Sequence, residues 1–252
     1  MLRVARQQQI QKIIGQNGNI AVSELHKMLG VSEVTIRRDL MELEDSGMIN
    51  RVHGGAVLAD NFNEEPVYSE RKIANQAQKA ALARHAVSLI EYGQSIFLDA
   101  GTTCNEVALL LPDNMNLTVV TNNLDVLSEL KNRKGIILIS LGGELGSDGN
   151  TLDGTFAIEN AELTSVDLCF FSTKSFSDNG LYNTSMIGSM VKRTVIQNAR
   201  YNYFIADSGK HNNSGMIMIC KWSDVDVFLT DSDLEQEAEV MLKKNNVNYI
   251  KV

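Results

Sequence analysis

The sequence predicts two units of different fold class: a small N-terminal α+β unit and a larger α/β unit after it. In residues 1–58, three short amphipathic helical patterns precede a Gly-Gly turn between two strand-like runs. Residues 59–66 are polar and end in one of only two prolines, which predicts a linker. In residues 67–252, strand-like and helical patterns alternate, which is typical of a mostly parallel sheet covered by helices.

The composition excludes several classes of protein. The chain has 252 residues, of which 44% are hydrophobic, so it can form packed cores. No stretch approaches 18 uninterrupted apolar residues, and the first residues lack the apolar segment of a signal peptide. The 3 cysteines are too few for a disulfide framework, and neither they nor the 4 histidines show zinc spacing. We therefore expect a cytoplasmic protein with no metal and no cofactor.

The charge is unevenly distributed. The formal net charge is −8, yet residues 1–57 carry seven basic and six acidic groups, a balance of +1. A protein that binds nucleic acid usually shows a basic surface, which this chain lacks as a whole. If the N-terminal unit binds DNA, it must do so through local clusters of charge. Several copies acting together would add their phosphate contacts, so we expect a homo-oligomer, a dimer or tetramer.

The N-terminal pattern is that of a winged helix-turn-helix. Ser32 can cap the third helix, in which Ile36, Leu40 and Leu43 recur on one face. Gly47 ends this helix, and residues 48–58 form a small hairpin with a turn at Gly54-Gly55. In such a motif the second helix of the pair lies in the major groove of DNA.

The face of the third helix opposite its apolar stripe supplies the candidate DNA contacts. An exposed Val34 can meet a thymine methyl group, and Arg37 or Arg38 can pair with guanine or clamp a phosphate. The helix N-terminus suits a phosphate, and the hairpin can reach the flanking backbone or minor groove. The candidates are Ser32, Val34, Thr35, Arg37, Arg38, Arg51 and His53. From the pattern alone, a solvated charged face explains these residues equally well.

The C-terminal unit is predicted as seven strands separated by helices. The strand candidates are 95–99, 117–121, 136–141, 166–172, 203–207, 225–230 and 249–252. A long helix over about 68–92 precedes them, and further helices are expected near 103–111, 124–133, 155–163, 185–200 and 233–245.

Small and polar residues follow three of these strands in succession. They are Asp99, Gly101, Thr102 and Thr103 after the first, Thr121 and Asn122 after the second, and Gly142 and Gly143 after the third. Ligands in open α/β sheets bind at the carboxyl ends of strands, and a helix N-terminus can hold a phosphate. Each junction alone is explained as well by ordinary turn chemistry. Together they predict one shared anion-binding site.

The N-terminal residues closely resemble the DNA-binding signature of the DeoR family of bacterial transcriptional regulators. The match runs through Val31-Ser32-x-x-Thr35-Ile36-Arg37-Arg38-Asp39-Leu40-x-x-Leu43-Glu44-x-x-Gly47 and Arg51-Val52-His53-Gly54-Gly55-Ala56. The resemblance continues through the C-terminal unit. It implies a winged helix-turn-helix joined to a sugar-phosphate-sensing domain whose fold resembles ribose-5-phosphate isomerase and CoA transferases.

The resemblance also implies roles in effector binding. Asp99 to Thr103, Thr121-Asn122 and Gly142-Gly143 look like the family's effector-site motifs, and Asp207-Ser208-Gly209-Lys210 resembles its Asp-Ser-Ser-Lys loop. Lys210 would then supply a cation to a phosphate, and Lys192 matches the lysine of the family's Val-Lys helix. A solvated helix lysine explains Lys192 equally well.

Two departures from the family pattern alter this expectation. Many relatives carry a glutamate shortly before Val-Lys, where this chain has Gly188-Ser189-Met190. The segment after the central strand, 172–182, is most similar to the branch that contains the ascorbate-utilisation repressor. There Lys174 adds a second cation for an acidic or phosphorylated ligand. The effector of this chain can therefore differ in class from the usual effector of the family.

These observations predict a DNA-binding transcriptional regulator, a repressor of a carbohydrate-utilisation operon. Its partners would be a double-stranded operator and a phosphorylated sugar or sugar acid, with no membrane. Two rival interpretations remain open. One is a sugar-phosphate isomerase with a small appendage, which needs a positioned base such as Asp99 or Asp207. The other is a sugar-phosphate-binding module whose DNA contact is vestigial.

Overall fold

The computed structural model describes residues 3, 6, 7, 9, 10, 13, 14, 19–45, 49–52, 55–58, 68–213 and 215–252. The chain divides into two compact units, residues 1–64 and 65–252, and each is considered by itself. The expected linker 59–66 and His53 lie outside the described residues, and so does the side chain of Arg51. No helix within the described ranges is long and apolar enough to cross a membrane.

The N-terminal unit is a helical cluster against a small antiparallel sheet. After a segment that is helical at its described positions, its elements are β1 (Asn19–Ala21), α2 (Val22–Leu29), α3 (Glu33–Asp45), β2 (Ile49–Val52) and β3 (Gly55–Leu58). The sheet has three strands in the order β1-β3-β2. β1 was not expected from the sequence. Its three residues pair with β3, so the hairpin becomes a three-stranded wing.

The helix ends and the buried face expected from the sequence are found in this unit. Gly30, with φ of +66°, closes α2 in a left-handed conformation that favours glycine. Ser32 Oγ accepts a hydrogen bond from the Thr35 amide at 3.3 Å, which caps α3 as predicted. Ile36, Leu40 and Leu43 are all buried, so the apolar stripe of α3 faces the core.

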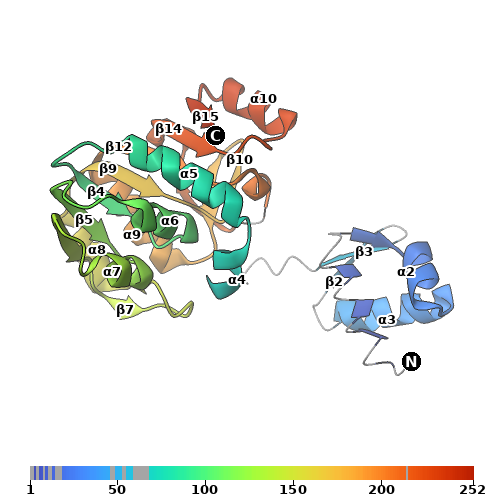
Figure 1. The fold of residues 1–252 in the computed structure, drawn as a ribbon. Coiled ribbons are helices and arrows are strands. Elements are labelled where there is room, and N and C mark those ends of the chain that lie inside the picture. The colour runs from blue at the N-terminus through green and yellow to red at the C-terminus, as the bar shows by residue number, and fades with distance from the viewer. Residues whose placement is uncertain are drawn as a thin grey trace. The chain divides into compact units, whose positions relative to one another are not determined.

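The C-terminal unit is built on a seven-stranded sheet in the order β15-β14-β12-β9-β4-β5-β6 (Figure 1). Its strands are β4 (Ser95–Leu98), β5 (Leu117–Thr121), β6 (Ile136–Ser140), β9 (Val166–Phe171), β12 (Ala199–Ile205), β14 (Val227–Thr230) and β15 (Tyr249–Lys251). All neighbouring pairs are parallel. The predicted α/β class and all seven strands are confirmed, and the carboxyl ends of the strands consequently lie along one edge.

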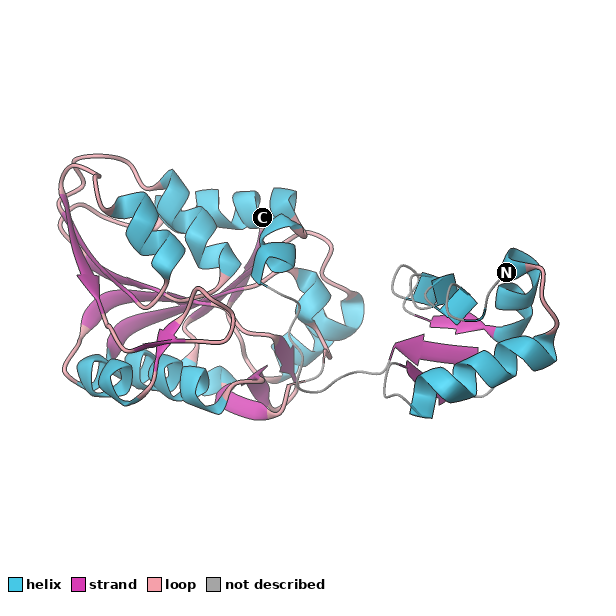
Figure 2. Ribbon diagram, turned by 90° about the horizontal axis from the view of Figure 1, so that it is seen from below, coloured by secondary structure: helices cyan, strands magenta, loops and turns pink. Residues whose placement is uncertain are grey.

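Helices cover both faces of this sheet (Figure 2). They are α4 (Tyr68–Ile73), α5 (Gln76–Ser88), α6 (Thr102–Leu110), α7 (Leu124–Leu130), α8 (Thr155–Glu162), α9 (Met186–Asn198) and α10 (Gln236–Lys244). Residues of α5, α6 and α7 share one buried cluster with Ile96 and Leu98 of β4. Residues of α8, α9 and α10 share the other with Phe97. The alternation along the strands therefore supplies two cores, one on each face.

The predicted long helix over 68–92 is wrong in its extent. Asn75 has a φ of +52°, which no helix interior accommodates, so the chain breaks there into α4 and α5. The helix expected to reach residue 200 ends at Asn198, because β12 begins at Ala199 and pairs with β9.

Two small antiparallel sheets were also missed. One joins β10 (Ser175–Ser177), β11 (Gly180–Asn183) and β13 (Ile217–Cys220), and the other joins β7 (Glu144–Leu145) and β8 (Leu152–Asp153). Gly180 has a φ of +139°, and a Cβ there would lie 2.5 Å from the Cys220 carbonyl oxygen. Only glycine permits this approach of β11 to β13, a tertiary constraint that leaves little local pattern.

A polar clamp joins the starts of β4 and β9. Asp167 Oδ2 accepts hydrogen bonds from the Ser95 amide at 2.8 Å and the Ser95 hydroxyl at 2.7 Å. In return, Ser95 Oγ accepts from the Asp167 amide at 3.0 Å. The hydrogen bonds from the Ser95 amide and hydroxyl lower the pKa of the Asp167 carboxyl.

The Asp167 carboxylate is expected to make stability depend on pH. Its pKa is lower in the folded state, so its contribution is full above the unfolded pKa of about 3.9 and is lost as the pH falls through the folded value. Asp167→Asn should therefore destabilise the unit by about 1 kcal/mol at pH 7 and by much less near pH 3. Urea unfolding followed through the single tryptophan, Trp222, measures this. The exposed Asp233→Asn is the matched control, and a pH-independent loss in Asp167→Asn would contradict the account.

Candidate functional site

The exposed face of α3 is the candidate DNA-binding surface. Val34 is 78% exposed, and Met41 lies in solvent on the same side of the helix. The guanidinium groups of Arg37 and Arg38 are also exposed. The buried and exposed faces predicted for this helix are confirmed, whereas the contacts with DNA stay a prediction.

Acidic side chains on the same helix moderate the charge of this face. Arg37 pairs with Glu33 at 3.1 Å, and Arg38 lies 3.7 Å from Glu42. Exposed pairs of this kind contribute only about 0.3–0.5 kcal/mol each, so a phosphate or a guanine can displace them readily. The N-terminal unit can therefore have a net charge near zero and still offer the guanidinium groups of Arg37 and Arg38 to a ligand.

Asp39, inside the same motif, faces the opposite way. It is buried, and its carboxylate accepts from Arg6 Nε at 2.5 Å and Arg6 Nη2 at 3.1 Å. This two-point ion pair ties the N-terminal helical segment to α3. Asp39 consequently fixes α3 against the N-terminal helical segment and does not belong to the exposed face of α3.

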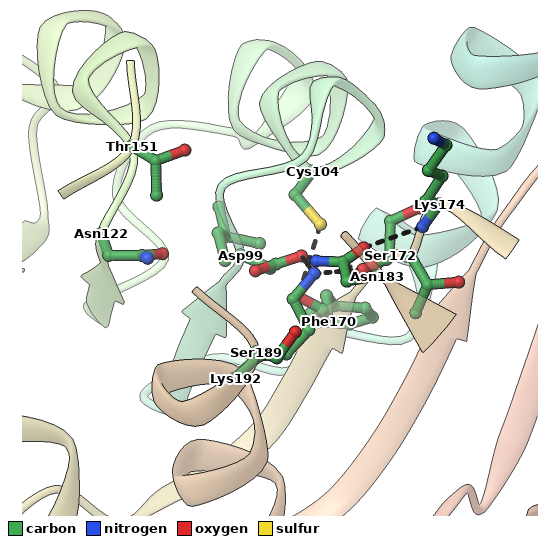
Figure 3. Close-up of polar contacts among 12 residues, drawn as sticks. Asp99, Cys104, Asn122, Thr151, Phe170, Ser172, Lys174, Asn183, Ser189 and Lys192 are labelled. Atoms are coloured by element: carbon green, nitrogen blue, oxygen red, sulfur yellow. Dashed lines mark hydrogen bonds and ion pairs between the residues drawn. The ribbon is translucent and has the colours of Figure 1, made fainter. Parts of the chain in front are cut away.

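In the C-terminal unit, polar residues gather at the carboxyl edge of the parallel sheet (Figure 3). Asp99 follows β4, Asn122 follows β5, Ser172 follows β9 and Asp207 follows β12. The sequence placed ligand-binding residues at this edge, and the structure brings Asp99, Lys192 and Lys210 together around the segment 172–173.

A buried ion pair forms the centre of this cluster. Lys192 Nζ, from α9, lies 2.8 Å from Asp99 Oδ2 and donates to the Ser172 carbonyl. The Ser172 amide donates to the same Asp99 oxygen at 3.1 Å. Lys192 is therefore no solvated helix lysine. Only Oδ2 of Asp99 takes part in these described contacts, so Oδ1 can accept from a ligand.

The first turn of α9 shows what stands where many relatives carry a glutamate. Ser189 is buried on α9, and its hydroxyl donates to the Ser185 carbonyl at 2.5 Å within its own helix. The first turn of α9 carries no acidic residue. Asp99 is consequently the carboxylate that balances Lys192.

Lys210 reaches the same segment from the loop after β12. Its Nζ donates to the Thr173 carbonyl at 2.6 Å and lies 3.4 Å from Ser172 Oγ. Asp231 holds this loop by accepting from the Ser208 amide at 2.7 Å and the Ser208 hydroxyl at 2.8 Å. The position of the Lys210 ammonium is thus set by the ends of β9 and β14.

The two predicted phosphate-binding helix ends differ. At the start of α7, Asn123 Oδ1 accepts from the amides of Asp125 at 2.8 Å and Val126 at 3.2 Å, so this end is already capped. At the start of α6, Gly101 is the N-cap and no side chain caps the first turn. The amides and hydroxyls at Thr102 and Thr103 therefore belong to the helix end that can accept an anion.

Gly101 and Asn122 shape the space around Asp99. A Cβ on Gly101 would lie 3.2 Å from Ser172 Cβ and 3.7 Å from Asp99 Oδ2, so a larger residue would crowd the cluster. Asn122 is buried, and its amide extends toward Asp99 (Figure 3). Asn122 Nδ2 donates to the Leu152 carbonyl at 3.1 Å, while Oδ1 has no partner among the described residues. A buried acceptor in this state favours a ligand that donates a hydrogen bond.

Other predicted residues are engaged locally. Thr121 Oγ1 donates to the Leu98 carbonyl at 2.6 Å and so has no proton left for a ligand. A Cβ on Gly143 would lie 2.1 Å from the Asp153 carbonyl oxygen, so glycine is needed there for β-hairpin packing. Gly142, its neighbour, donates from its amide to Ser140 Oγ at 3.0 Å. The Lys174 side chain extends away from the Asp99–Lys192 pair (Figure 3).

One further cation was missed by the sequence analysis. Lys79, on α5, is buried, and its Nζ donates to the Arg71 carbonyl. Burial lowers the pKa of this ammonium, and the charge of Lys210 lowers it further. A lysine inside a helical pattern carries no local signal of burial, so only the fold reveals it.

Comparison with known proteins gives matches to both units. The family model described as DeoR C terminal sensor domain matches residues 74–232, and the one described as DeoR-like helix-turn-helix domain matches residues 6–62. The uncharacterized HTH-type transcriptional regulator YulB of Bacillus subtilis is 36% identical, covering 100% of this chain and 98% of the relative. The glycerol-3-phosphate regulon repressor of Escherichia coli is 31% identical over 92% of each chain. Among solved structures, ribose 5-phosphate isomerase A from Methanocaldococcus jannaschii has a TM-score of 0.41 and 16% identity over 56% of each chain.

Removal of one member of the buried ion pair should lower the free energy of unfolding more when the other member is still present. Asp99→Asn leaves the buried Lys192 ammonium without a carboxylate, and Lys192→Met leaves the buried Asp99 carboxylate without a cation. Each single variant should therefore lower the free energy of unfolding by about 3–5 kcal/mol. The double variant should cost clearly less than the sum, because neither charge is then left buried alone. Urea unfolding of the four proteins through Trp222 fluorescence measures the coupling. Additivity within about 0.5 kcal/mol would show that the pair does not act as a unit.

Proposed function

Because this chain belongs to the DeoR family of transcriptional regulators, we propose that it represses a carbohydrate-utilisation operon under the control of a phosphorylated sugar or sugar acid. The chain is a regulator and not an isomerase, and it joins a helix-turn-helix domain to an α/β sensor domain. The relative named for the glycerol-3-phosphate regulon supports an effector that carries a phosphate.

The observation that carries the effector class is the presence of two lysine ammonium groups at the carboxyl edge. Lys192 and Lys210 converge on the segment 172–173 beside the uncapped start of α6. In our assignment the phosphate binds the amides of Thr102 and Thr103 and the Lys210 ammonium. Asp99 Oδ1 and Asn122 Oδ1 accept from the hydroxyl groups of the sugar. Gly101 lines this site and Thr121 supports it through its bond to the Leu98 carbonyl. Gly142 and Gly143 shape the neighbouring turn, and Lys174 extends away from the Asp99–Lys192 pair.

The N-terminal unit supplies operator binding. The exposed Arg37 and Arg38 contact bases or phosphates in the major groove, with Val34 and Thr35 beside them and Ser32 at the helix end. Arg51 and His53 in the wing reach the flanking DNA. Because the charge balance of each N-terminal unit is near zero, two or more copies acting in the cytoplasm supply enough phosphate contacts. The effector then shifts the relative placement of the copies and so the half-site spacing.

Removal of both guanidinium groups should weaken operator recognition. The full-length protein is expected to shift a DNA fragment from the promoter region of its own genetic neighbourhood at low salt, and Arg37→Ala/Arg38→Ala should weaken that binding at least about tenfold, because each pairing with a base contributes about 1–3 kcal/mol. Fluorescence anisotropy over a salt series measures both affinity and phosphate contacts.

The matched control removes the same charge elsewhere. Arg84→Ala/Arg200→Ala takes two exposed arginines from the sensor domain and should leave operator affinity within about twofold. Equal losses in the two double variants, or no sequence-specific binding by the wild type, would refute the assignment of α3 as the recognition helix.

A phosphorylated ligand should stabilise the full-length protein against heat. A compound at 100 times its Kd adds about 2.7 kcal/mol, which a thermal-shift screen of phosphorylated sugars, sugar acids and alditols detects. Lys210→Met should remove the shift because it removes the cation that the phosphate contacts. The exposed Lys134→Met should retain the shift. Equal shifts by the unphosphorylated counterparts would refute the phosphate assignment.

A further inference from the structure

The seven-stranded sheet of the sensor domain ends at β6 with an edge that no described strand covers. β6 pairs with β5 on one side, and the stretch from Gly135 to Gly143 contains no charged residue and no proline. Proteins usually protect such an edge with lysine, proline, a bulge or a covering helix, because its free amide and carbonyl groups pair readily with another strand. β15, at the opposite edge, is three residues long, and its Lys251 lies 2.8 Å from Glu239 of α10. β6 lacks this protection.

The free backbone groups of β6 belong to Ile136, Leu138 and Ser140. The Leu141 amide donates to a carbonyl of β5, and the Gly135 carbonyl accepts from an amide of β5. In a parallel strand the amide and the carbonyl of one residue point to the same side, so the odd-numbered residues of β6 bond to β5. The groups of the even-numbered residues therefore point outward, where a further strand can bond to them.

Large apolar side chains stand exposed along the same edge. Ile136 and Leu138 pack against the buried cluster under α5, α6 and α7. Because successive side chains of a strand alternate between the faces of a sheet, Ile137 and Ile139 project from the other face. Ile137 is 64% exposed and Ile139 is 43% exposed. The helices on that face therefore leave these two isoleucines in solvent.

Helix α8 extends this apolar surface. Phe156, Asn160 and Leu163 recur at helical spacing, so they share one side of α8. Asn160 Nδ2 donates to the Leu141 carbonyl at 2.8 Å, which turns that side toward the end of β6. Phe156 is 69% exposed and Leu163 is 87% exposed. The exposed side of α8 thus continues the exposed face of β6.

We call Ile137, Ile139, Phe156 and Leu163 together the β6 surface. Monomeric proteins rarely expose contiguous apolar patches larger than a few hundred Å². These side chains offer on the order of 400 Å², about half of the ~800 Å² that each partner of a standard interface buries. Pairing of the adjacent free strand edge and contacts around it would add to this area. The β6 surface is therefore large enough to form the centre of an interface.

The charges around β6 favour a second copy of this chain as the partner. Lys131 and Lys134 precede β6 and are exposed, and Arg133 between them is in ion pairs. Glu144 follows β6 and lies opposite Asp153 in the β7–β8 pair. An antiparallel copy of β6 brings the basic end of each strand beside the acidic end of the other. A parallel copy would instead bring like charges together.

The backbone pattern fixes the register of an antiparallel pair. A two-fold axis at Leu138 lets the outward groups of Ile136 bond with those of Ser140 of the partner subunit, and the reverse. Ile137 then lies directly opposite Ile139 of the partner subunit, in a non-hydrogen-bonded pair with Cα atoms about 4.5 Å apart. Branched side chains in such a pair stabilise the association. Each of the two exposed isoleucines consequently covers the other.

We propose that the β6 surface and the free edge of β6 form the interface between two copies of this chain, with antiparallel β6 strands joining the two sheets into one. A two-fold interface uses both free edges, so this pairing closes at two copies. The inference deepens the proposed function, which requires two or more copies at the operator, and it does not depend on the effector site.

Sedimentation equilibrium of the full-length protein tests the β6 surface. Ile137→Lys/Ile139→Lys places lysines opposite lysines at both isoleucine pairs. The matched control, Tyr92→Lys/Val240→Lys, adds the same charge at two exposed positions elsewhere in the sensor domain. We expect the wild type and the control to associate alike. The β6 double variant should raise the dissociation constant at least about a hundredfold, because like charges facing each other across an interface repel.

Disulfide cross-linking tests the register and also decides the matter if the lysine variant does not fold. Full-length Ile137→Cys and Ile139→Cys are produced separately and co-expressed, then oxidised. The three native cysteines are buried, which protects them from the oxidant. Linked dimers should form in the co-expressed sample and in neither variant alone, because only positions 137 and 139 of different copies lie within bridging distance.

The outcomes separate this inference from the proposed function. If the lysines leave association unchanged and the co-expressed cysteine variants do not link, the β6 edge is not the interface, whereas operator binding by copies joined elsewhere still stands. Equal linking in each cysteine variant alone would also overturn the proposed register. A wild type that is monomeric at the concentration at which it binds the operator would overturn the interface together with the requirement for several copies.

Discussion

The buried ion pair between Lys192 and Asp99 is the interaction on which the sensor domain depends. It joins α9, from one face of the sheet, to the ends of β4 and β9. Because Lys192 uses one oxygen of Asp99 and the Ser172 amide uses the same oxygen, the carboxylate is oriented and its other oxygen is left for a ligand. Without the pair, the segment 172–173 would lose the support against which Lys210 is positioned.

The remaining cations around this pair give the edge its chemistry. Asp99 is balanced by Lys192, and Lys210 brings a second ammonium group to the segment 172–173. The uncapped α6 start adds amide donors, whereas the α7 start is closed by Asn123. This difference between two similar strand–turn–helix junctions indicates which of them holds the anion. The α4 helix contacts α7 through Lys72 and Asp125, and it contacts α5 through the Arg71 carbonyl and Lys79.

Sequence patterns predicted the parallel sheet well, because each central strand is an apolar run bounded by turn residues. They did not predict the break at Asn75, since the residues on both sides continue a helical pattern. The left-handed turn depends on the tolerance of asparagine for that conformation and on the contact of Asn75 with Asp207. β1 and the strands around Gly180 are three or four residues long and exist through tertiary pairing.

The two candidate sites also contain features that local sequence patterns predict and features that only tertiary contacts determine. The exposure of Arg37 and Arg38 could be read from helical periodicity, since Ile36, Leu40 and Leu43 fix the buried face. The inward direction of Asp39 depends on Arg6, a residue 33 positions away, and no local pattern contains it. At the sheet edge, Asp99 and Lys210 were found through motifs. The engagement of the Thr121 hydroxyl by the backbone and the burial of Lys79 require the assembled fold.

The central claim is that an anion at the sheet edge and DNA at α3 are linked. The most direct test measures this linkage in both directions on one full-length protein. Operator affinity is determined by anisotropy with and without a saturating phosphorylated compound that stabilises the protein. The affinity for that compound is then determined with and without saturating operator. The account predicts that both affinities change by the same factor, between about 5 and 150, as thermodynamic reciprocity requires. If the compound binds tightly and neither affinity changes, the sensor site does not control DNA binding and the account is wrong.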